Sequence, residues 1–346
     1  MRTEPITHPS AWHGDMLERD RSFEHHLQPR HLNEIETALR QVKTHGLSLA
    51  EITRERFVLP TLAGKLGAIA RELTDGLGFA LLRGLPVARY PIEDLEKVYW
   101  GLCAHLGTGI TQNGQGDLIH YVTDGRLRPS QGSRGVGLPH RSRLHVDLTD
   151  CVSLLCVRQA PDDPPSQVAS SMWIYNEVLR QRPRDLRLLY EGFYWDRKEE
   201  HRAGEHATTE YKVPLFSERD GLVSCRYNRA WIEPAARRRG EALTDAQVAL
   251  LDFIDEVAAK ACLSFSFQPG DIQFCNNYTV FHGRPAHAPI EDETKKRLLL
   301  RIWLDFDEAR PMSDPAIVRY GIVRHGALGW PAPAVLHARQ HGVHPR

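Results

Sequence analysis

The sequence predicts an α+β fold whose core is a double-stranded β-helix, a jelly roll of two sheets, with helices packed outside it. Short apolar strands alternate with turns over much of the region 78–310. Helical periodicity marks the N-terminal third and residues 245–261. Polar motifs at 145–147 and at 282 lie in strand-like segments far apart in the chain, and such a fold can bring them together.

Length and composition fit one large domain or two smaller ones, and we expect a single domain over residues 1–346. The chain has 346 residues, of which 41% are hydrophobic and 25% charged, values that are ordinary for a globular protein with a sizeable core. We expect an N-terminal arm and helix at 1–47, a jelly-roll core at 78–310 with an inserted excursion at about 185–245, and a C-terminal tail at 311–346.

Charge and cysteine usage narrow the classes of partner. Basic and acidic residues balance at 44 each, which gives no support for nucleic-acid binding. No stretch approaches the roughly 18–20 apolar residues of a membrane span, and Met1–Pro5 does not begin a secretory signal. The six cysteines include no Cys-x-x-Cys pair. We expect a cytoplasmic protein with reduced thiols that acts on a small molecule. Its oligomeric state stays open.

Apolar spacing and glycine or proline stops place the elements in order. The expected helices cover about residues 31–45, Leu62–Leu73, Ile92–Leu106, a segment from about 170 through Leu189, and Asp245–Ala261. The expected strands are Phe79–Gly84, Arg143–Leu148, Cys151–Val157, Ser264–Gln268, Ile272–Cys275, Thr279–Phe281 and Arg297–Phe306. The glycine-rich segment Gly107–Arg141 is long for a plain connection, which favours a functional loop or further short strands.

A His-x-Asp motif offers two metal ligands side by side. Side chains alternate along a strand, so His145 and Asp147 share one face while Val146 turns into the core. Two histidines and one carboxylate are the set that holds non-haem Fe(II) with other coordination positions open. His145 and Asp147 alone fit a buried hydrogen-bonded pair equally well. A second motif of this kind, His13-Gly14-Asp15, lacks strand flanks and is interpreted as surface.

The third ligand and a pair of arginines come from the C-terminal strands. His282 follows an apolar strand, and Arg297 and Arg301 then share one face of the last strand. A buried arginine needs an anion, because an isolated buried charge costs several kcal/mol or more. A guanidinium matches a carboxylate with two parallel hydrogen bonds, so a dicarboxylic co-substrate would fit. An internal ion pair with Asp or Glu is the alternative for each arginine.

These segments resemble the TauD/TfdA family of Fe(II)- and 2-oxoglutarate-dependent dioxygenases, in the clavaminate synthase-like group. The resemblance covers most of residues 30–325. It is carried by Phe79–Gly84, His145-Val146-Asp147, Ser166–Asn176, Ser224–Asn228, Phe267–Asn277 with His282, and Arg297–Leu304.

The resemblance implies a role for each matching residue. His145, Asp147 and His282 would be the iron ligands, and Arg297 would hold the distal carboxylate of 2-oxoglutarate. Arg301 matches a position that touches an acidic substrate group in some relatives, and Ser166 matches a hydroxyl that helps to hold the co-substrate. An ordinary turn hydroxyl is the alternative for Ser166.

The turn before Ser166 departs from the family pattern. Relatives usually carry Gly-Gly where this chain has Asp163 and Pro164, followed by Pro165. Proline fixes φ and removes a donor, so the turn cannot keep the whole backbone geometry of the relatives.

The predicted activity is oxidation of an aliphatic carbon, by hydroxylation or desaturation, with 2-oxoglutarate and O2 as co-substrates and release of succinate and CO2. We expect a small substrate with an anionic group, because Arg301 lies one strand repeat beyond Arg297. Gln112, Tyr121, Arg226 and Tyr227 are candidates for the pocket wall, with packing as the alternative. Two rival functions are a zinc hydrolase that uses the same three ligands and a jelly-roll binding protein without catalysis.

Overall fold

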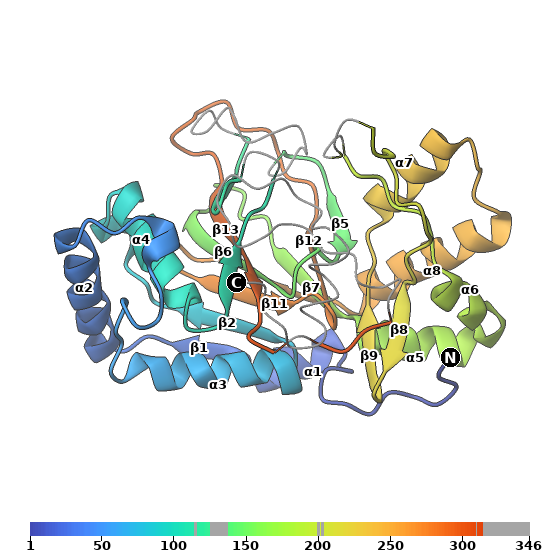
Figure 1. Cartoon of the computed structure of the whole chain (residues 1–346), viewed down its shortest axis with the longest axis horizontal. Helices are drawn as coiled ribbons and strands as arrows, with labels where there is room; N and C mark the ends of the chain where they lie inside the picture. Colours follow the sequence, from blue (N-terminus) through green and yellow to red (C-terminus); the bar gives the residue numbers. More distant parts are fainter. Residues whose placement is uncertain (114–115, 125–137, 199–200, 202–203, 309, 314–346) are drawn as a thin grey trace.

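Two β-sheets stacked face to face form the centre of the protein, with helices on their outer faces (Figure 1). The computed structural model describes residues 1–113, 116–124, 138–198, 201, 204–308 and 310–313. The loop or short strands expected at Gly107–Arg141 fall in part on residues 125–137, which lie outside these ranges. Most of the C-terminal tail expected at 311–346 also lies outside them. Among the described residues, no helix is both long and apolar enough to cross a membrane.

The larger sheet has the strand order β1-β2-β11-β6-β13-β3, and β4 also pairs with β13. Its strands are β1 (Glu24–His26), β2 (Phe79–Arg83), β3 (Thr108–Ile110), β4 (His120–Val122), β6 (Cys151–Arg158), β11 (Ile272–Asn276) and β13 (Leu298–Asp305). The smaller sheet has the order β10-β7-β12-β5. Its strands are β5 (Ser142–His145), β7 (Ser166–Ser170), β10 (Leu263–Phe265) and β12 (Val280–Arg284). A separate hairpin joins β8 (Phe216–Arg219) to β9 (Leu222–Cys225).

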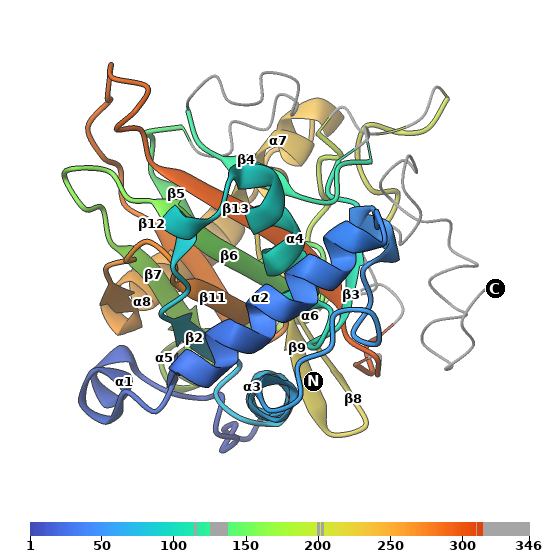
Figure 2. The same cartoon turned by 90° about the vertical axis from the view of Figure 1, so that its left-hand side faces the viewer.

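Alternation along β13 divides the core in two. Leu300 and Ile302 belong to the apolar cluster that includes α2 (Pro29–Thr44), α3 (Leu62–Asp75) and α4 (Ile92–Cys103), which cover the outer face of the larger sheet (Figure 2). Leu299 and Trp303 belong to the cluster between the two sheets. The inward positions of β13 therefore reach the space in which a ligand can be held.

The remaining helices lie around the smaller sheet. They are α1 (Gly14–Asp20), α5 (Ser171–Gln181), α6 (Leu186–Glu191), α7 (Arg229–Arg239) and α8 (Asp245–Ala261), and short 3-10 turns occupy Leu49–Glu51, Val87–Arg89 and Pro183–Asp185. The prediction for α8 is confirmed at both ends: Thr244 caps it by accepting from the Gln247 amide. The excursion from about 185 to 245 contains α6, the β8–β9 hairpin and α7.

Several predicted elements differ from the structure. The strand expected at Ser264–Gln268 is Leu263–Phe265, and the helix expected at Ile92–Leu106 ends at Cys103. The single helix expected to run through Leu189 is two helices, because Pro183 follows Arg182 and the residue before a proline disfavours helical geometry. The strand expected at Arg143–Leu148 ends at His145. The strand expected at Thr279–Phe281 continues to Arg284, because it pairs with β5 and β7 on its two sides.

Candidate metal centre and active site

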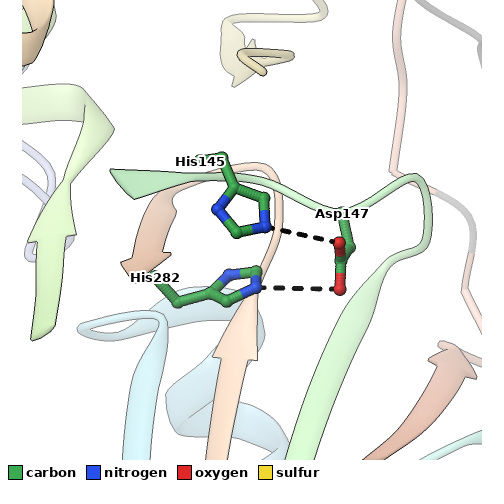
Figure 3. Close-up of side chains that lie close together, drawn as sticks. All are labelled: His145, Asp147 and His282. Carbon is green, nitrogen blue, oxygen red and sulfur yellow. Dashed lines mark ion pairs between the residues drawn. The ribbon is translucent and has the colours of Figure 1, made fainter. Parts of the chain in front are cut away.

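Three ligand side chains meet at the edge of the smaller sheet (Figure 3). His282 on β12 is the direct register partner of His145 on β5. Asp147 lies just beyond β5, where Val146 donates its amide to Tyr227 O at 2.9 Å and is fully buried. Asp147 donates its own amide to Asn277 Oδ1 at 3.0 Å. The expected juxtaposition is therefore present, although backbone and side-chain contacts rather than the strand orient Asp147.

The geometry of this cluster fits one metal ion. His145 Nε2 lies 3.7 Å from Asp147 Oδ1, and His282 Nε2 lies 3.7 Å from Asp147 Oδ2. One ligand atom from each residue lies within 4.8 Å of the other two. Bonds of about 2.1 Å to a metal place neighbouring ligand atoms about 3 Å apart, so small side-chain movements would close the site. The donor set, two imidazoles and a carboxylate, suits Fe(II).

The protonation of the ligands favours metal binding. His145 Nδ1 lies 2.7 Å from Arg143 O, a carbonyl that can only accept a hydrogen bond, so the ring proton is on Nδ1. The lone pair of Nε2 is then available to bind a metal ion. Burial, reinforced by His145, lowers the pKa of His282 to about 3. Burial alone would raise the pKa of Asp147, but the Arg301 charge and then the two histidines hold that pKa well below its usual range. At neutral pH His282 is therefore neutral and Asp147 ionised.

Arg297 is a buried cation beside the metal cluster. Its Nε donates to Gln159 Oε1 at 3.0 Å, and its two Nη groups have no hydrogen-bond partner among the described residues. Burial, followed by the charge of Arg284, lowers the pKa of Arg297 to about 10. Arg297 forms no ion pair with any described residue, so the alternative of an internal ion pair does not hold for it. Its guanidinium faces the cleft that contains the metal ligands.

Arg301 and Ser166 also line this cleft but already have partners. Arg301 Nε donates to Gln112 Oε1 at 2.8 Å, and Arg301 Nη1 lies 3.5 Å from Asp147 Oδ2. The alternative of an internal ion pair is thus present for Arg301. Ser166 opens β7 and donates to Gln273 Oε1 at 3.0 Å. The preceding turn places Asp163 at φ +44°, a left-handed geometry that aspartate tolerates.

The four proposed pocket-wall residues do not line the cleft. Gln112 lies behind Arg301. Tyr121 donates to Glu96, Tyr227 donates to Asp255, and Arg226 lies 4.4 Å above the Tyr278 ring. The alternative of packing therefore holds for these four residues, since sequence position alone does not say which side of a segment faces the cavity. His13, from the other His-x-Asp motif, instead accepts from the Asp15 amide at the start of α1.

The cleft measures about 970 Å³ and reaches from the metal cluster to α7. Its outer wall was not predicted from the sequence, and in this wall cationic side chains outnumber carboxylates. The charged residues of that wall are Arg141, Arg143, Lys198, Asp196, Arg229, Glu233, Arg237 and Arg238. Arg229 is neutralised by Glu233, Asp252 and Asp255, whereas Arg141 and Arg237 form no ion pair with any described residue. The charge runs between 195 and 245 were the available signal.

Comparison with known proteins decides the family. The sequence matches the family described as "Taurine catabolism dioxygenase TauD, TfdA family" over residues 43–303. The chain belongs to the TauD/TfdA family. It is an Fe(II)- and 2-oxoglutarate-dependent oxygenase with the metal triad His145, Asp147 and His282.

Individual TauD/TfdA relatives agree with this assignment. FR-33289 synthase of Streptomyces rubellomurinus is 31% identical over 316 residues, which cover 89% of this chain and 92% of the relative. The taurine hydroxylase-like protein SAT17 of Stachybotrys chartarum is 28% identical over 305 residues, covering 84% and 77%. Neither relative supports the zinc hydrolase or the non-catalytic binding protein.

Solved structures show the same fold. Asparagine oxygenase, in a complex with Fe(II), 2S,3S-3-hydroxyasparagine and succinate, superposes with a TM-score of 0.65 at 16% identity, over 82% of this chain and 93% of the other. The non-heme iron oxygenase OrfP, in a complex with Fe and alpha-ketoglutaric acid, gives 0.62 at 18% identity, over 86% and 100%. The expected clavaminate synthase-like jelly roll is confirmed.

Proposed function

We propose that the protein hydroxylates an aliphatic carbon of a small, anionic organic substrate. One oxygen atom of O2 enters the product, and 2-oxoglutarate loses CO2 to become succinate, which takes the other. The observation that carries the proposal is the metal triad at the inner end of a cleft that also holds the unpaired Nη groups of Arg297.

Each residue of the inner cleft has a proposed task. When bound, Fe(II) with 2-oxoglutarate would activate O2, and O2 supplies the oxidising power needed to remove a hydrogen atom from an unactivated carbon. Arg297 holds the distal carboxylate of the co-substrate with two parallel hydrogen bonds. Ser166 also lines the cleft, and its hydroxyl would turn from Gln273 Oε1 to donate to the same carboxylate. Leu154 and Leu299 line the cleft and keep water from the reacting carbon.

The anionic character of the substrate is supported by the charge of the cleft. Arg301 lies next to Asp147, on the same face of β13 as the inward residues Leu299 and Trp303. We propose that Arg301 attracts an acidic group of the substrate, and that Arg141 and Arg237 raise the local concentration of anions at the mouth. Asparagine oxygenase and OrfP were solved in complexes with hydroxylated amino acids. Small organic acids and amino acids are therefore the classes of substrate to test first.

The deciding experiment has two arms. Anaerobic addition of Fe(II) and 2-oxoglutarate should produce a weak visible charge-transfer band. In air, a panel of amino acids, sulfonates and other organic acids should then be screened for stimulated succinate release. A product heavier by one oxygen identifies hydroxylation, and one lighter by two hydrogens identifies desaturation. Absence of both the band and succinate would refute the proposal.

We also propose a cytoplasmic location and no nucleic-acid partner. All six cysteines are free thiols, and five of them are buried, which suits a reducing compartment. The equal numbers of basic and acidic residues support the second point. Fractionation of the native host and a binding assay with duplex DNA and RNA at low salt would test the two statements.

A further inference from the structure

The carboxylate of Asp147, one of the three metal ligands, accepts a hydrogen bond from the indole of Trp303. Trp303 Nε1 donates to Asp147 Oδ2 at 2.8 Å, shorter than any other contact of that oxygen. Trp303 is 1% exposed and Asp147 8% exposed, so water does not compete for this bond. Oδ1 lies on the other side of the carboxylate, towards His145 Nε2. The two oxygens of Asp147 therefore have different surroundings before any metal binds.

The indole has little freedom to move. Trp303 lies within β13, opposite Val152 of β6 on one side and Ile110 of β3 on the other. The guanidinium carbon of Arg301 lies 4.7 Å from the centre of the Trp303 ring system.

Gln112 in turn fixes Arg301. It accepts from Arg301 Nε at 2.8 Å, and its Nε2 donates to Arg301 O at 2.7 Å and to Leu118 O at 2.9 Å. Both ends of the Gln112 amide are thus used to keep Arg301 against the indole. This packing fixes the direction of the indole N–H.

We propose that Trp303 is a positioning residue that makes Asp147 a ligand through one oxygen only, Oδ1. A carboxylate that used both oxygens would fill one of the positions that 2-oxoglutarate and O2 need. A hydrogen-bond donor on Oδ2 opposes that arrangement, and groups that bond to metal ligands commonly set their orientation. Arg301, at 3.5 Å from the same oxygen, adds its charge to this restraint. This inference rests on the metal site of the proposed function.

The test compares two variants, each of which loses one hydrogen bond donated by an indole N–H. Trp303→Phe removes the donor to Asp147. Trp12→Phe is the matched control, because Trp12 is also 1% exposed, donates from Nε1 to a carbonyl, Leu77 O, at 2.9 Å, and does not line the cleft. Fe(II) affinity and 2-oxoglutarate affinity of the Fe(II)-loaded protein are measured anaerobically, the latter from the charge-transfer band. Neither measurement needs turnover.

The expected result is a selective loss of 2-oxoglutarate binding. In Trp303→Phe the co-substrate should bind the Fe(II)-loaded protein about 10–100-fold more weakly, with a smaller change in Fe(II) affinity, while Trp12→Phe matches the wild type. Equal co-substrate affinities in the two variants would overturn the proposal.

If Trp303→Phe does not fold, benzothienylalanine introduced at position 303 keeps the shape of the indole and removes only the N–H. The same loss is then expected, and wild-type affinity would overturn the proposal. A wild-type protein that gives no band with Fe(II) and 2-oxoglutarate would instead refute the proposed function.

Discussion

His145 and His282 are register partners in the pairing of β5 with β12, and the centres of their imidazole rings lie 4.5 Å apart. Two residues more than a hundred positions apart in the sequence thereby become direct neighbours on adjacent strands. The register of β12 on β5 decides whether the two nitrogens can share an ion, because a slip of one residue would turn one ring to the other face.

Replacement of His145 by alanine should abolish iron-dependent formation of succinate. The variant loses one of three metal ligands and keeps the fold, since His145 lies at a partly exposed strand end. His13→Ala is the matched control, because His13 belongs to the other His-x-Asp motif, caps α1, packs against Trp173 and does not line the cleft. Succinate release and Fe(II) binding are measured for both. Iron-dependent turnover that persists in the His145 variant would contradict the metal assignment.

Arg297→Ala should raise the KM for 2-oxoglutarate. A hydrogen bond to a charged group contributes about 1.5–3 kcal/mol, so a KM increase of about 10–150-fold is expected. Arg158→Ala serves as control, because Arg158 donates to the carbonyls of Lys296 and Glu293 and does not line the cleft. Initial rates at varied 2-oxoglutarate concentration give both values. A KM unchanged in Arg297→Ala would show that another group holds the distal carboxylate.

Arg301→Ala should remove the preference for an acidic substrate over its neutral amide. Loss of a charged contact predicts a fall of about tenfold or more in kcat/KM for the acid and a smaller fall for the amide. The smaller fall reflects the contact of Arg301 with Asp147, which both reactions need. The measurement is kcat/KM for an acid and amide pair found in the succinate screen. An equal fall for the two would assign Arg301 to the metal ligand alone.

Gly283→Ala should weaken metal binding and destabilise the protein. A Cβ at Gly283 would lie 2.7 Å from Ser142 O and 3.0 Å from Leu144 N, so β12 and β5 would have to separate next to both histidines. Gly64→Ala is the control: it lies in α3 with no atom within 4 Å of the added Cβ, and it should gain up to about 1 kcal/mol. Denaturant midpoints and Fe(II) affinity distinguish the two. Normal affinity in Gly283→Ala would mean that the strands tolerate the extra carbon.

The metal-free protein should lose stability on acidification below about pH 6.5. The His282 pKa is about 3 in the folded state, against an ordinary value of 6.5, so between these values the unfolded chain binds a proton that the folded protein does not. Stability from this residue is fully present above pH 6.5 and falls towards pH 3, by at most about 1.4 kcal/mol per pH unit. Chemical denaturation across this range measures the slope. His282→Gln should flatten it, and an unchanged slope would assign the effect to other groups.

The sequence predicted the parts of the site that depend on local rules. Apolar spacing predicted the helix at Asp245–Ala261, and the His-x-Asp spacing with the later His282 predicted the ligand set. The expected strand alternation of side chains over Arg143–Leu148 did not hold beyond His145, where β5 ends. Val146 instead bonds to Tyr227 and Asp147 to Asn277, which are residues distant in the sequence.

Contacts that depend on sheet closure could not be predicted from the sequence. The bond from Trp303 to Asp147 joins residues 156 positions apart, and no pattern in either segment signals it. The cleft face of α7 was missed for the same reason. Its charged residues were visible in the sequence, but not the side of the helix that they would occupy.

Among the described strands, β5 lies at one border of the smaller sheet, so His145, one of the two imidazole ligands, is on a strand with a neighbour on one side only. Strands at a border open locally more readily than central ones. Iron would cross-link β5 to β12 and stabilise their pairing. Backbone amides of residues 142–145 should therefore exchange with deuterium much more slowly once the ion is bound.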